Sequence, residues 1–232
     1  MKVLFFDTET SGLPQDVCRN TLSLVNKHLW PNIVQYSSVT LDTETGTIES
    51  MSDYIVKVDD NIVLDGQSAE IHGITNLISR TRGVPIEEVL EKFTKECENA
   101  DLIVAHNLDF DKNMLLKEWY DLIASDDKVK SHKFTKPYIK FKDVISKVKK
   151  KCTLKSNIQR VNIKAIAKKD GKEYVKWPTL AELHAHLFKD DISGVNLHNA
   201  LVDTMICARC WYNIEYNKDL RSECVAMQEI IG

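Results

Sequence analysis

The sequence predicts an α/β fold, a mixed five-stranded sheet flanked by helices, and three observations support that prediction. Residues 2–10 contain an apolar run without alternation, which is typical of a strand buried on both faces. Two more strand-like segments follow before any helix. Short apolar strands then alternate with segments of helical spacing. This order indicates a mixed sheet with helices packed on it.

The individual elements are expected in a simple order. The first three strands, which include residues 33–46 and 48–58, form an antiparallel meander. Helical spacing follows over residues 85–99, with Pro85 at the first helical position. The later elements are a short strand at 101–106, a helix at 108–123, a last strand at 140–145, a helix that Pro178 opens, and a final helix at about 199–216.

Length and composition suit one compact domain over residues 1–232. Hydrophobic residues make up 43% and charged residues 28%, an ordinary globular balance, and the net charge of −3 does not mark the whole chain as a polyanion binder. The lysines are concentrated, however. Between Lys128 and Lys155, Asp143 is the only acid, so this stretch either contacts nucleic acid or is a solvated loop. We expect a lysine-rich insertion or mobile loop around residues 146–176.

The chain has no feature of a secreted or membrane protein. Nothing resembles a secretory signal, and Met1 leads directly into the first expected strand. No apolar run approaches the ~20 residues that a membrane span needs. We therefore expect an intracellular protein, cytoplasmic or nuclear, with reduced cysteines and no membrane contact.

Two carboxylates at the end of the first strand carry the first indication of chemistry. Asp7 and Glu9 are two residues apart, so on an extended strand they point to the same side. Two such carboxylates repel each other unless a cation lies between them. A turn after the strand, with Asp7 capping local backbone groups, is the alternative.

Two further acids are expected on buried helix faces. Asp111 and Asp203 each lie among apolar neighbours three and four residues away. A buried carboxylate needs a partner, which is a salt bridge or a metal ion, unless it is stabilised at a helix N-terminus. His198 lies five residues before Asp203, an offset of about 140° on a helix. The two side chains cannot share a helical face, so His198 must lie on the loop before the helix if both serve one site.

Three strings in the sequence resemble the motifs of a known enzyme group. FFDTETSGL, AHNLDFD and HNALVD are similar to the three motifs of the DEDDh exonucleases, and AEIHGIT resembles a segment of their epsilon-like branch. The group includes the epsilon proofreading subunit of bacterial replicative polymerases, ribonuclease T and the mammalian three-prime repair exonucleases. The resemblance spans residue 3 to about residue 211 and implies an RNase H-like fold.

The resemblance also implies a role for each motif residue. Asp7, Glu9, Asp111 and Asp203 would hold two Mg²⁺ or Mn²⁺ ions, for which oxygen ligands are suited, and His198 would act as general base. Asp109 is excluded because the acid of the family follows the phenylalanine, here Phe110. The positions that would contact substrate are Thr10, Leu13, His72, Ile74 and Asn107.

The function that follows is a metal-dependent 3′→5′ exonuclease acting on DNA. It would release nucleoside 5′-monophosphates from a single-stranded 3′ end, in proofreading or repair, either free-standing or bound to a DNA polymerase. The motifs leave an RNA-trimming enzyme open, because discrimination rests on contacts to the 2′-OH. A non-catalytic nucleic-acid-binding module is the third alternative, since a fold alone does not fix a function.

Two other patterns are interpreted as structural. Cys207 and Cys210 form a CxxC, and His184 and His186 form an HxH, which together suggest zinc. The cysteines lie on one helix face, where buried thiols are commonly inert, and the two histidines point to different sides of their helix. The tryptophans at 119, 177 and 211 are expected in the core, although Trp177 follows the basic stretch and stacking on a base stays open for it.

Overall fold

The structure is a computed structural model, and it describes the chain except for residues 17–20, 65, 130, 191, 193–194 and 232. Its centre is a five-stranded sheet in the order β3-β2-β1-β4-β5. The sheet strands are β1 (Lys2–Thr10), β2 (Ile33–Asp42), β3 (Thr47–Ile55), β4 (Leu102–Ala105) and β5 (Lys149–Cys152). Strands β1, β2 and β3 form the predicted antiparallel meander, whereas β4 and β5 run parallel to β1. The predicted mixed α/β sheet is confirmed.

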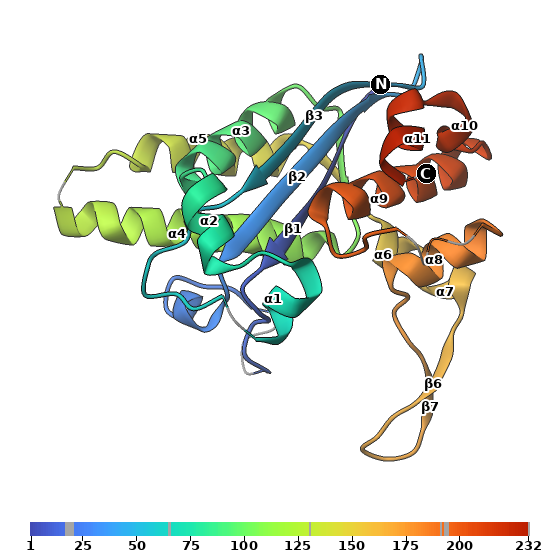
Figure 1. Ribbon diagram of the computed structural model, residues 1–232, viewed down its shortest axis with the longest axis horizontal. Coiled ribbons are helices and arrows are strands. Elements are labelled where there is room, and N and C mark those ends of the chain that lie inside the picture. The colour runs from blue at the N-terminus through green and yellow to red at the C-terminus, as the bar shows by residue number, and fades with distance from the viewer. Residues whose placement is uncertain (17–20, 65, 130, 191, 193–194, 232) are drawn as a thin grey trace.

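Helices cover both faces of this sheet (Figure 1). One core cluster packs α3 (Ile86–Glu98), α4 (Leu108–Val129) and α5 (Thr135–Lys147) against the even-numbered residues of β1, such as Leu4 and Phe6. The other cluster packs α9 (Ala200–Tyr216) against the odd-numbered residues. Because side chains alternate along a strand, β1 is apolar on both sides and contributes to both cores.

The remaining elements are short. They are η2 (Lys27–Leu29), α1 (Gln67–His72), α2 (Asn76–Arg82), α6 (Thr153–Ser156), α7 (Ile158–Val161), β6 (Lys164–Ile166), β7 (Glu173–Val175), α8 (Leu180–Leu187), α10 (Leu220–Glu223) and α11 (Val225–Ile231). Helix α8 begins with a capping box, in which the Thr179 and Glu182 side chains each accept a hydrogen bond from the other's backbone N–H. Within the described residues, no helix is both long enough and apolar enough to cross a membrane.

One predicted element is wrong. Residues 140–145 lie inside α5 and do not form the last strand. Phe141 and Val144 share helical spacing with Tyr138 and Val148, and all four pack in the core cluster of α3 and α4. The last strand of the sheet is instead β5, whose sequence is KKKC.

The lysine-rich segment at 146–176 has regular structure. It supplies β5 to the central sheet, then two short helices, then a hairpin of β6 and β7 that pairs with no other described strand. Six of its lysines are paired with acids: Lys147 with Asp143, Lys151 with Glu215, Lys155 with Asp109, Lys164 with Glu173, Lys172 with Asp170 and Lys176 with Glu182. Only the hairpin extends away from the body of the molecule (Figure 1). That the chain forms a single domain stays a prediction.

Candidate active site

The alternation of β1 aims two carboxylates at one helix layer. Val3 and Phe5 face the core beneath α9, and Asp7 and Glu9 continue the same series of odd-numbered residues. Thr8, between the two acids, faces the opposite layer. The end of β1 therefore presents acids toward α9 and a hydroxyl toward α4.

The hydroxyl of Thr8 connects Asp111 to the strand. Asp111 lies in the first turn of α4 and is only 2% exposed. The backbone N–H of Thr8 donates to Asp111 Oδ1 at 3.1 Å, and the Thr8 hydroxyl donates to the same oxygen at 2.8 Å. These two bonds hold the carboxylate at the end of β1, where it approaches Asp7 from the opposite layer.

Helix α9 brings the remaining two groups. Asn199 caps the helix, since its side chain accepts from the backbone N–H of Leu201 and Val202. His198 lies just before the cap, at a φ of 67°, and its backbone N–H donates to Asp203 Oδ2 at 3.2 Å. The predicted loop position of His198 is therefore correct. Positive φ is uncommon for a residue other than glycine, and such strained positions concentrate at functional sites.

A second contact fixes α9 over the strand end. The backbone N–H of Ala200 donates to Gln35 Oε1 at 3.2 Å, and Gln35 lies directly opposite Glu9 in the pairing of β2 with β1. As a result, ligand atoms of Glu9, His198 and Asp203 all lie within 4.8 Å of one another.

All four carboxylates have a raised pKa, and neighbouring acids contribute to the rise for Asp7 and Glu9. Burial, and then the charges of Asp111, Asp203 and Glu9, raise the pKa of Asp7 well above its usual range. Burial followed by Asp203 and Asp111 raises the pKa of Glu9 to about 8. Burial also raises the pKa of Asp111 to about 7 and that of Asp203 to about 6, although Thr8 and His198 oppose these shifts.

This donor set fits divalent cations of the Mg²⁺ or Mn²⁺ kind. The groups whose charges raise the pKa of Asp7 and Glu9 are other acids of the same cluster, so several like charges lie close together. Carboxylate oxygens are the ligands that such hard cations prefer, and bound cations would offset the repulsion.

The predicted substrate-binding residues differ in their surroundings. Leu13 is 70% exposed beside Gly12, and the buried Thr10 hydroxyl donates to the carbonyl of Gly12 at 2.7 Å. His72 Nδ1 accepts from the backbone N–H of Ile74 at 3.1 Å. Burial lowers the pKa of His72; the Thr10 backbone opposes this shift, whereas the nearby His198 adds to it.

Two more members of that set are fixed by the fold. Ile74 is buried in a small apolar cluster with Val34, Val58 and Leu64, and its contact with substrate stays a prediction. Asn107 lies at the turn between β4 and α4 with a φ of 72°. Asparagine tolerates this conformation better than most residues. The turn places Asn107 four residues before Asp111, at the carboxylate end of the sheet.

Asp109 does not join the cluster. Its oxygens accept from Lys112 Nζ at 2.8 Å and from Lys155 Nζ at 2.5 Å, and its side chain is about half exposed. The bonds to Lys112 and then to Lys155 lower its pKa to about 2. The exclusion of Asp109 in favour of Asp111 therefore agrees with its surroundings.

The CxxC and HxH patterns do not join the cluster of acids, although Asp7 lies close enough to Cys207 to add to the rise in its pKa. Cys207 and Cys210 are buried in the core beneath α9, where burial raises the pKa of both thiols. His184 is buried against Arg209, whereas His186 is exposed on a different side of α8. The five cysteines in the described part of the chain are free, and Cys18 lies outside it.

Two features of this region were not predicted. Trp119 and Trp211 are in the core as expected, but the core interpretation is wrong for Trp177, which is 56% exposed. His106, just before Asn107, is hydrogen-bonded between Thr153 and the backbone of Pro178. No sequence pattern marks His106, because its partners lie 47 and 72 residues away. The exposed position of Trp177 was signalled only by the basic stretch before it.

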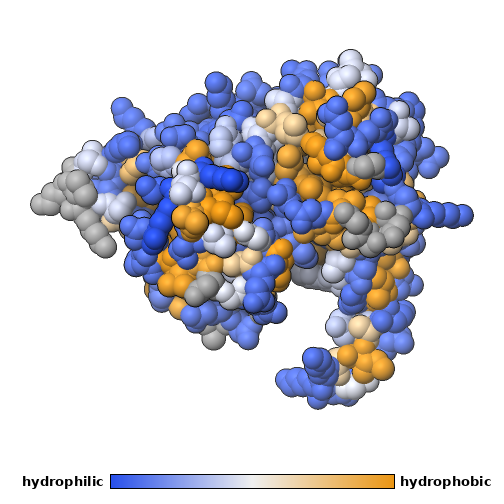
Figure 2. All heavy atoms as spheres, viewed as in Figure 1, coloured by the Kyte–Doolittle hydropathy of each residue, from blue (hydrophilic) through white to orange (hydrophobic). Residues whose placement is uncertain are grey.

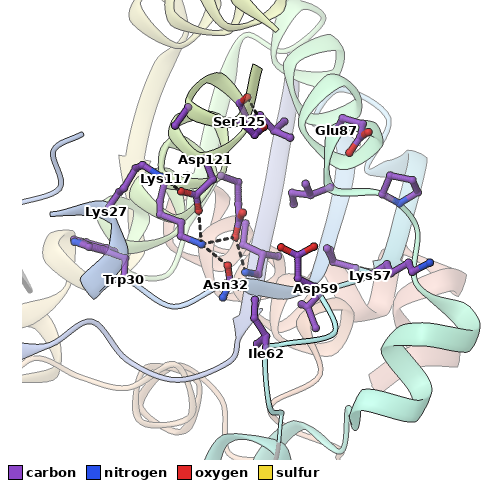
Figure 3. Close-up of a pocket in the computed structure, with 18 of the residues that line it drawn as sticks. Lys27, Trp30, Asn32, Lys57, Asp59, Ile62, Glu87, Lys117, Asp121 and Ser125 are labelled. Atoms are coloured by element: carbon purple, nitrogen blue, oxygen red, sulfur yellow. Dashed lines mark hydrogen bonds and ion pairs between the residues drawn. The ribbon is translucent and has the colours of Figure 1, made fainter. Parts of the chain in front are cut away.

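A cavity of about 890 Å³ lies near η2 and α4, and none of the four carboxylates lines it (Figure 3). The Lys117 ammonium points toward Asn32 and Asp121 and contacts both of them. Acidic and basic residues both line this cavity, and several are already paired. We therefore assign the chemistry to the carboxylate cluster.

The fold and the cluster together define a nuclease of the RNase H-like class. The chain belongs to the exonuclease family of the RNase T type, whose sequence profile it matches over residues 4–210. The resemblance predicted from the three motifs is thereby confirmed. No curated protein matches the chain in sequence.

Solved structures show the same fold. Escherichia coli exonuclease I in complex with a dT13 oligonucleotide has a TM-score of 0.60 and 14% identity, over 93% of this chain and 41% of that one. Exonuclease I from Methylocaldum szegediense has a TM-score of 0.56 and 13% identity, over 95% and 42%. A zinc-bound form of the E. coli enzyme with single-stranded DNA has a TM-score of 0.57 and 16% identity, over 93% and 41%. This chain thus spans about two-fifths of the length of these proteins.

Proposed function

We propose that this protein is a metal-dependent 3′→5′ exonuclease that removes nucleoside 5′-monophosphates from the 3′ end of single-stranded DNA. The observation that carries the proposal is the convergence of four carboxylates, one buried and three partly buried, from β1, α4 and α9, beside an exposed histidine. Membership in the exonuclease family supports it. DNA is favoured because similar structures are complexes of exonuclease I with DNA oligonucleotides.

Each residue has a role that follows from its surroundings. Asp7, Glu9, Asp111 and Asp203 would hold two Mg²⁺ or Mn²⁺ ions. When bound, such ions stabilise charge on the phosphate and on the leaving 3′ oxygen. Thr8 orients the Asp111 carboxylate with two hydrogen bonds and so presets the geometry of the cluster.

His198 would take the proton from the attacking water. Its backbone, through the bond to Asp203, fixes where the loop lies, while its exposed ring is close to Glu9 and Asp203. A general base must come within hydrogen-bond reach of the water that it activates, and a loop residue beside the ligands meets that requirement. The proton then leaves to solvent from the exposed imidazole.

The deciding experiment compares matched single-stranded DNA and RNA, labelled at either end, with Mg²⁺, Mn²⁺ or EDTA. We expect stepwise shortening of the 5′-labelled DNA, immediate release of a labelled mononucleotide from the 3′ end, and no reaction in EDTA. Preferred degradation of RNA would make the enzyme an RNA-trimming nuclease. Cleavage from the 5′ end, or persistent activity in excess EDTA, would contradict the proposal. A role in proofreading or repair would be supported by co-purification with a DNA polymerase.

A further inference from the structure

The hairpin of β6 and β7, with the residues that flank it at 163–177, forms an arm beside the active-site end of the sheet. Lys164 pairs with Val175 and Ile166 with Glu173, and the arm shares no sheet with other described strands. From its root to its turn it has about five residues on each side, or about 16 Å at ~3.3 Å per residue. Figure 2 shows the arm separated from the rest of the molecule by open space.

The surface of this arm is basic and partly aromatic. It carries five lysines and two acids, Asp170 and Glu173, in a chain whose overall charge is −3. Ile166 is 71% exposed and Tyr174 is 49% exposed. An isolated two-stranded hairpin has no core of its own to bury such side chains, so their exposure points to a partner.

The root of the arm is fixed to the active-site turn. His106 Nε2 donates to the carbonyl of Pro178 at 3.1 Å. Burial lowers the pKa of His106 to about 4, so at neutral pH its Nδ1 is free to accept from the Thr153 hydroxyl at 3.0 Å. His106 directly precedes Asn107, and it therefore connects the arm to the turn that leads into Asp111.

Trp177 stands at this root with its ring exposed. Lys155 Nζ lies 6.0 Å from the centre of the ring, and the same ammonium bonds to Asp109, two residues from Asp111. Lys155 and the neighbouring Pro178 thus place the indole near the N-terminal end of α4. An exposed indole near a nuclease site is suited to stack on an unpaired base.

We propose that this arm is a binding surface for single-stranded DNA on the 5′ side of the scissile bond. Trp177 stacks on a base close to the site, and the lysines at the turn, Lys168, Lys169 and Lys172, contact phosphates further along the strand. Charge complementarity selects a polyanion, and the exposed aromatic ring selects unpaired bases over a duplex. The inference rests on the proposed function, because the 3′ end must lie at the carboxylates.

The test measures binding apart from cleavage. Binding is measured in EDTA by fluorescence anisotropy with a labelled oligothymidylate of about 20 nucleotides. This length is greater than the active site alone can contact. Trp177→Ala should weaken this binding by about 5-fold or more, because stacking contributes about 1–3 kcal/mol per base. Trp177→Phe should restore most of it. The variant Lys168→Gln, Lys169→Gln, Lys172→Gln should weaken binding and reduce the salt slope by up to about 0.7 per lost contact.

Two controls distinguish an effect of the arm from a general loss of positive charge and from damage to the active site. The matched variant Lys133→Gln, Lys136→Gln, Lys142→Gln removes as many exposed lysines near or within α5 and should bind normally. Hydrolysis of a trinucleotide, which is too short to reach the turn of the arm, should be the same in the triple-lysine arm variant as in the wild type. The proposal is overturned if the arm variants bind normally, if the α5 variant loses as much, or if trinucleotide hydrolysis by the triple-lysine arm variant falls as much as its binding. If the wild type binds the oligonucleotide without degrading it, the proposed nuclease function is refuted but the proposed DNA-binding role of the arm is not.

Discussion

His198 is positioned by its backbone and is free to act through its side chain. His198→Ala should lower kcat by about 10²- to 10⁴-fold, the usual contribution of a general base, with a much smaller change in KM. Because a base acts only when unprotonated, wild-type activity should rise with pH and then level off. Steady-state rates with Mg²⁺ between acid and alkaline pH would measure both effects.

The matched control is His186→Ala, which removes an exposed histidine of α8 outside the cluster. It should leave rate and pH profile unchanged. A His198→Ala enzyme with a normal rate, or with the wild-type pH profile at a reduced rate, would remove the histidine from the proton transfer.

Asp111 and Asp109 offer a test within one turn of helix. Asp111→Asn should abolish activity, because it removes a metal ligand that Thr8 orients. It should also raise the melting temperature in EDTA, because it removes one charge from a buried cluster in which the acids repel one another. Asp109→Asn should keep trinucleotide hydrolysis, because its carboxylate is bound to Lys112 and Lys155. Activity assays and thermal melts of the two variants would check the pair. An inactive Asp109→Asn enzyme, with active Asp111→Asn, would reverse the assignment.

The residues of the cluster could be predicted because each leaves a local signal. Asp7 and Glu9 alternate with Thr8, and Asp111 and Asp203 interrupt apolar helix faces, so charge occurs where a core residue is expected. Ile74 and Trp177 leave no such signal. Whether an apolar side chain in a loop is buried depends on which distant segments pack against it, and one sequence does not show that.

At the scale of elements, hydrophobic periodicity predicted the wrong element where it was judged over a short segment. Six residues at 140–145 fit a strand, but the longer spacing from Tyr138 to Val148 is helical. Strand β5 was missed for a different reason. Its three lysines carry no hydrophobic pattern, and the strand is held by backbone pairing with β4 at the edge of the sheet. Lysines are common on such edges because they discourage pairing with other chains.

A buried lysine of α4 holds the segment that leads into β2. The Lys117 side chain is 3% exposed, and its ammonium contacts Asn32, Glu118 and Asp121. The Asn32 carbonyl accepts from the backbone N–H of Ser11, and the Asn32 backbone N–H donates to the Ser11 hydroxyl, beside the loop of Leu13. Lys117→Met should lower the free energy of unfolding by about 3 kcal/mol, since removing one partner of a buried pair leaves the other uncompensated.

Denaturant unfolding would measure this loss, and Lys112→Met provides the control. Lys112 also pairs with an acid on α4, Asp109, but at the surface. Exposed pairs contribute little, so its removal should change stability by less than about 1 kcal/mol. Equal effects of the two substitutions would mean that the buried contacts of Lys117 do not stabilise the segment.

For the whole molecule, the sequence order of strands and helices was enough to predict a mixed sheet with helices on its faces. It was not enough to predict the arm, because the same lysine-rich composition suits a solvated loop and a projecting hairpin. The short helices α10 and α11 were also missed. They cover the core beneath α9 through Leu220 and Met227, which are too few apolar positions to give a periodic signal.

The acidic cluster should make the stability of the whole protein depend on pH and on divalent cations. Folding raises the pKa of Glu9 to about 8, of Asp111 to about 7 and of Asp203 to about 6, so the folded state binds more protons than the unfolded state above about pH 4. Stability in EDTA should therefore fall as the pH rises toward about 8. His106 acts oppositely between about pH 4 and 6.5, because burial lowers its pKa. The fall should be clearest above 6.5, where His106 no longer opposes it.

Thermal melts from pH 6.5 to about 8, with EDTA or with excess Mg²⁺ or Mn²⁺, would test this dependence. Cations bind the folded, deprotonated cluster, so they should raise the melting temperature by mass action, and by more at higher pH. A gain of about 2–3 kcal/mol corresponds to about 5–10 °C in a domain of this size. Asp111→Asn should lose most of this gain, whereas Asp109→Asn should keep it. If cations raise the melting temperature equally in both variants, or if stability in EDTA rises with pH, the four carboxylates do not form the metal site.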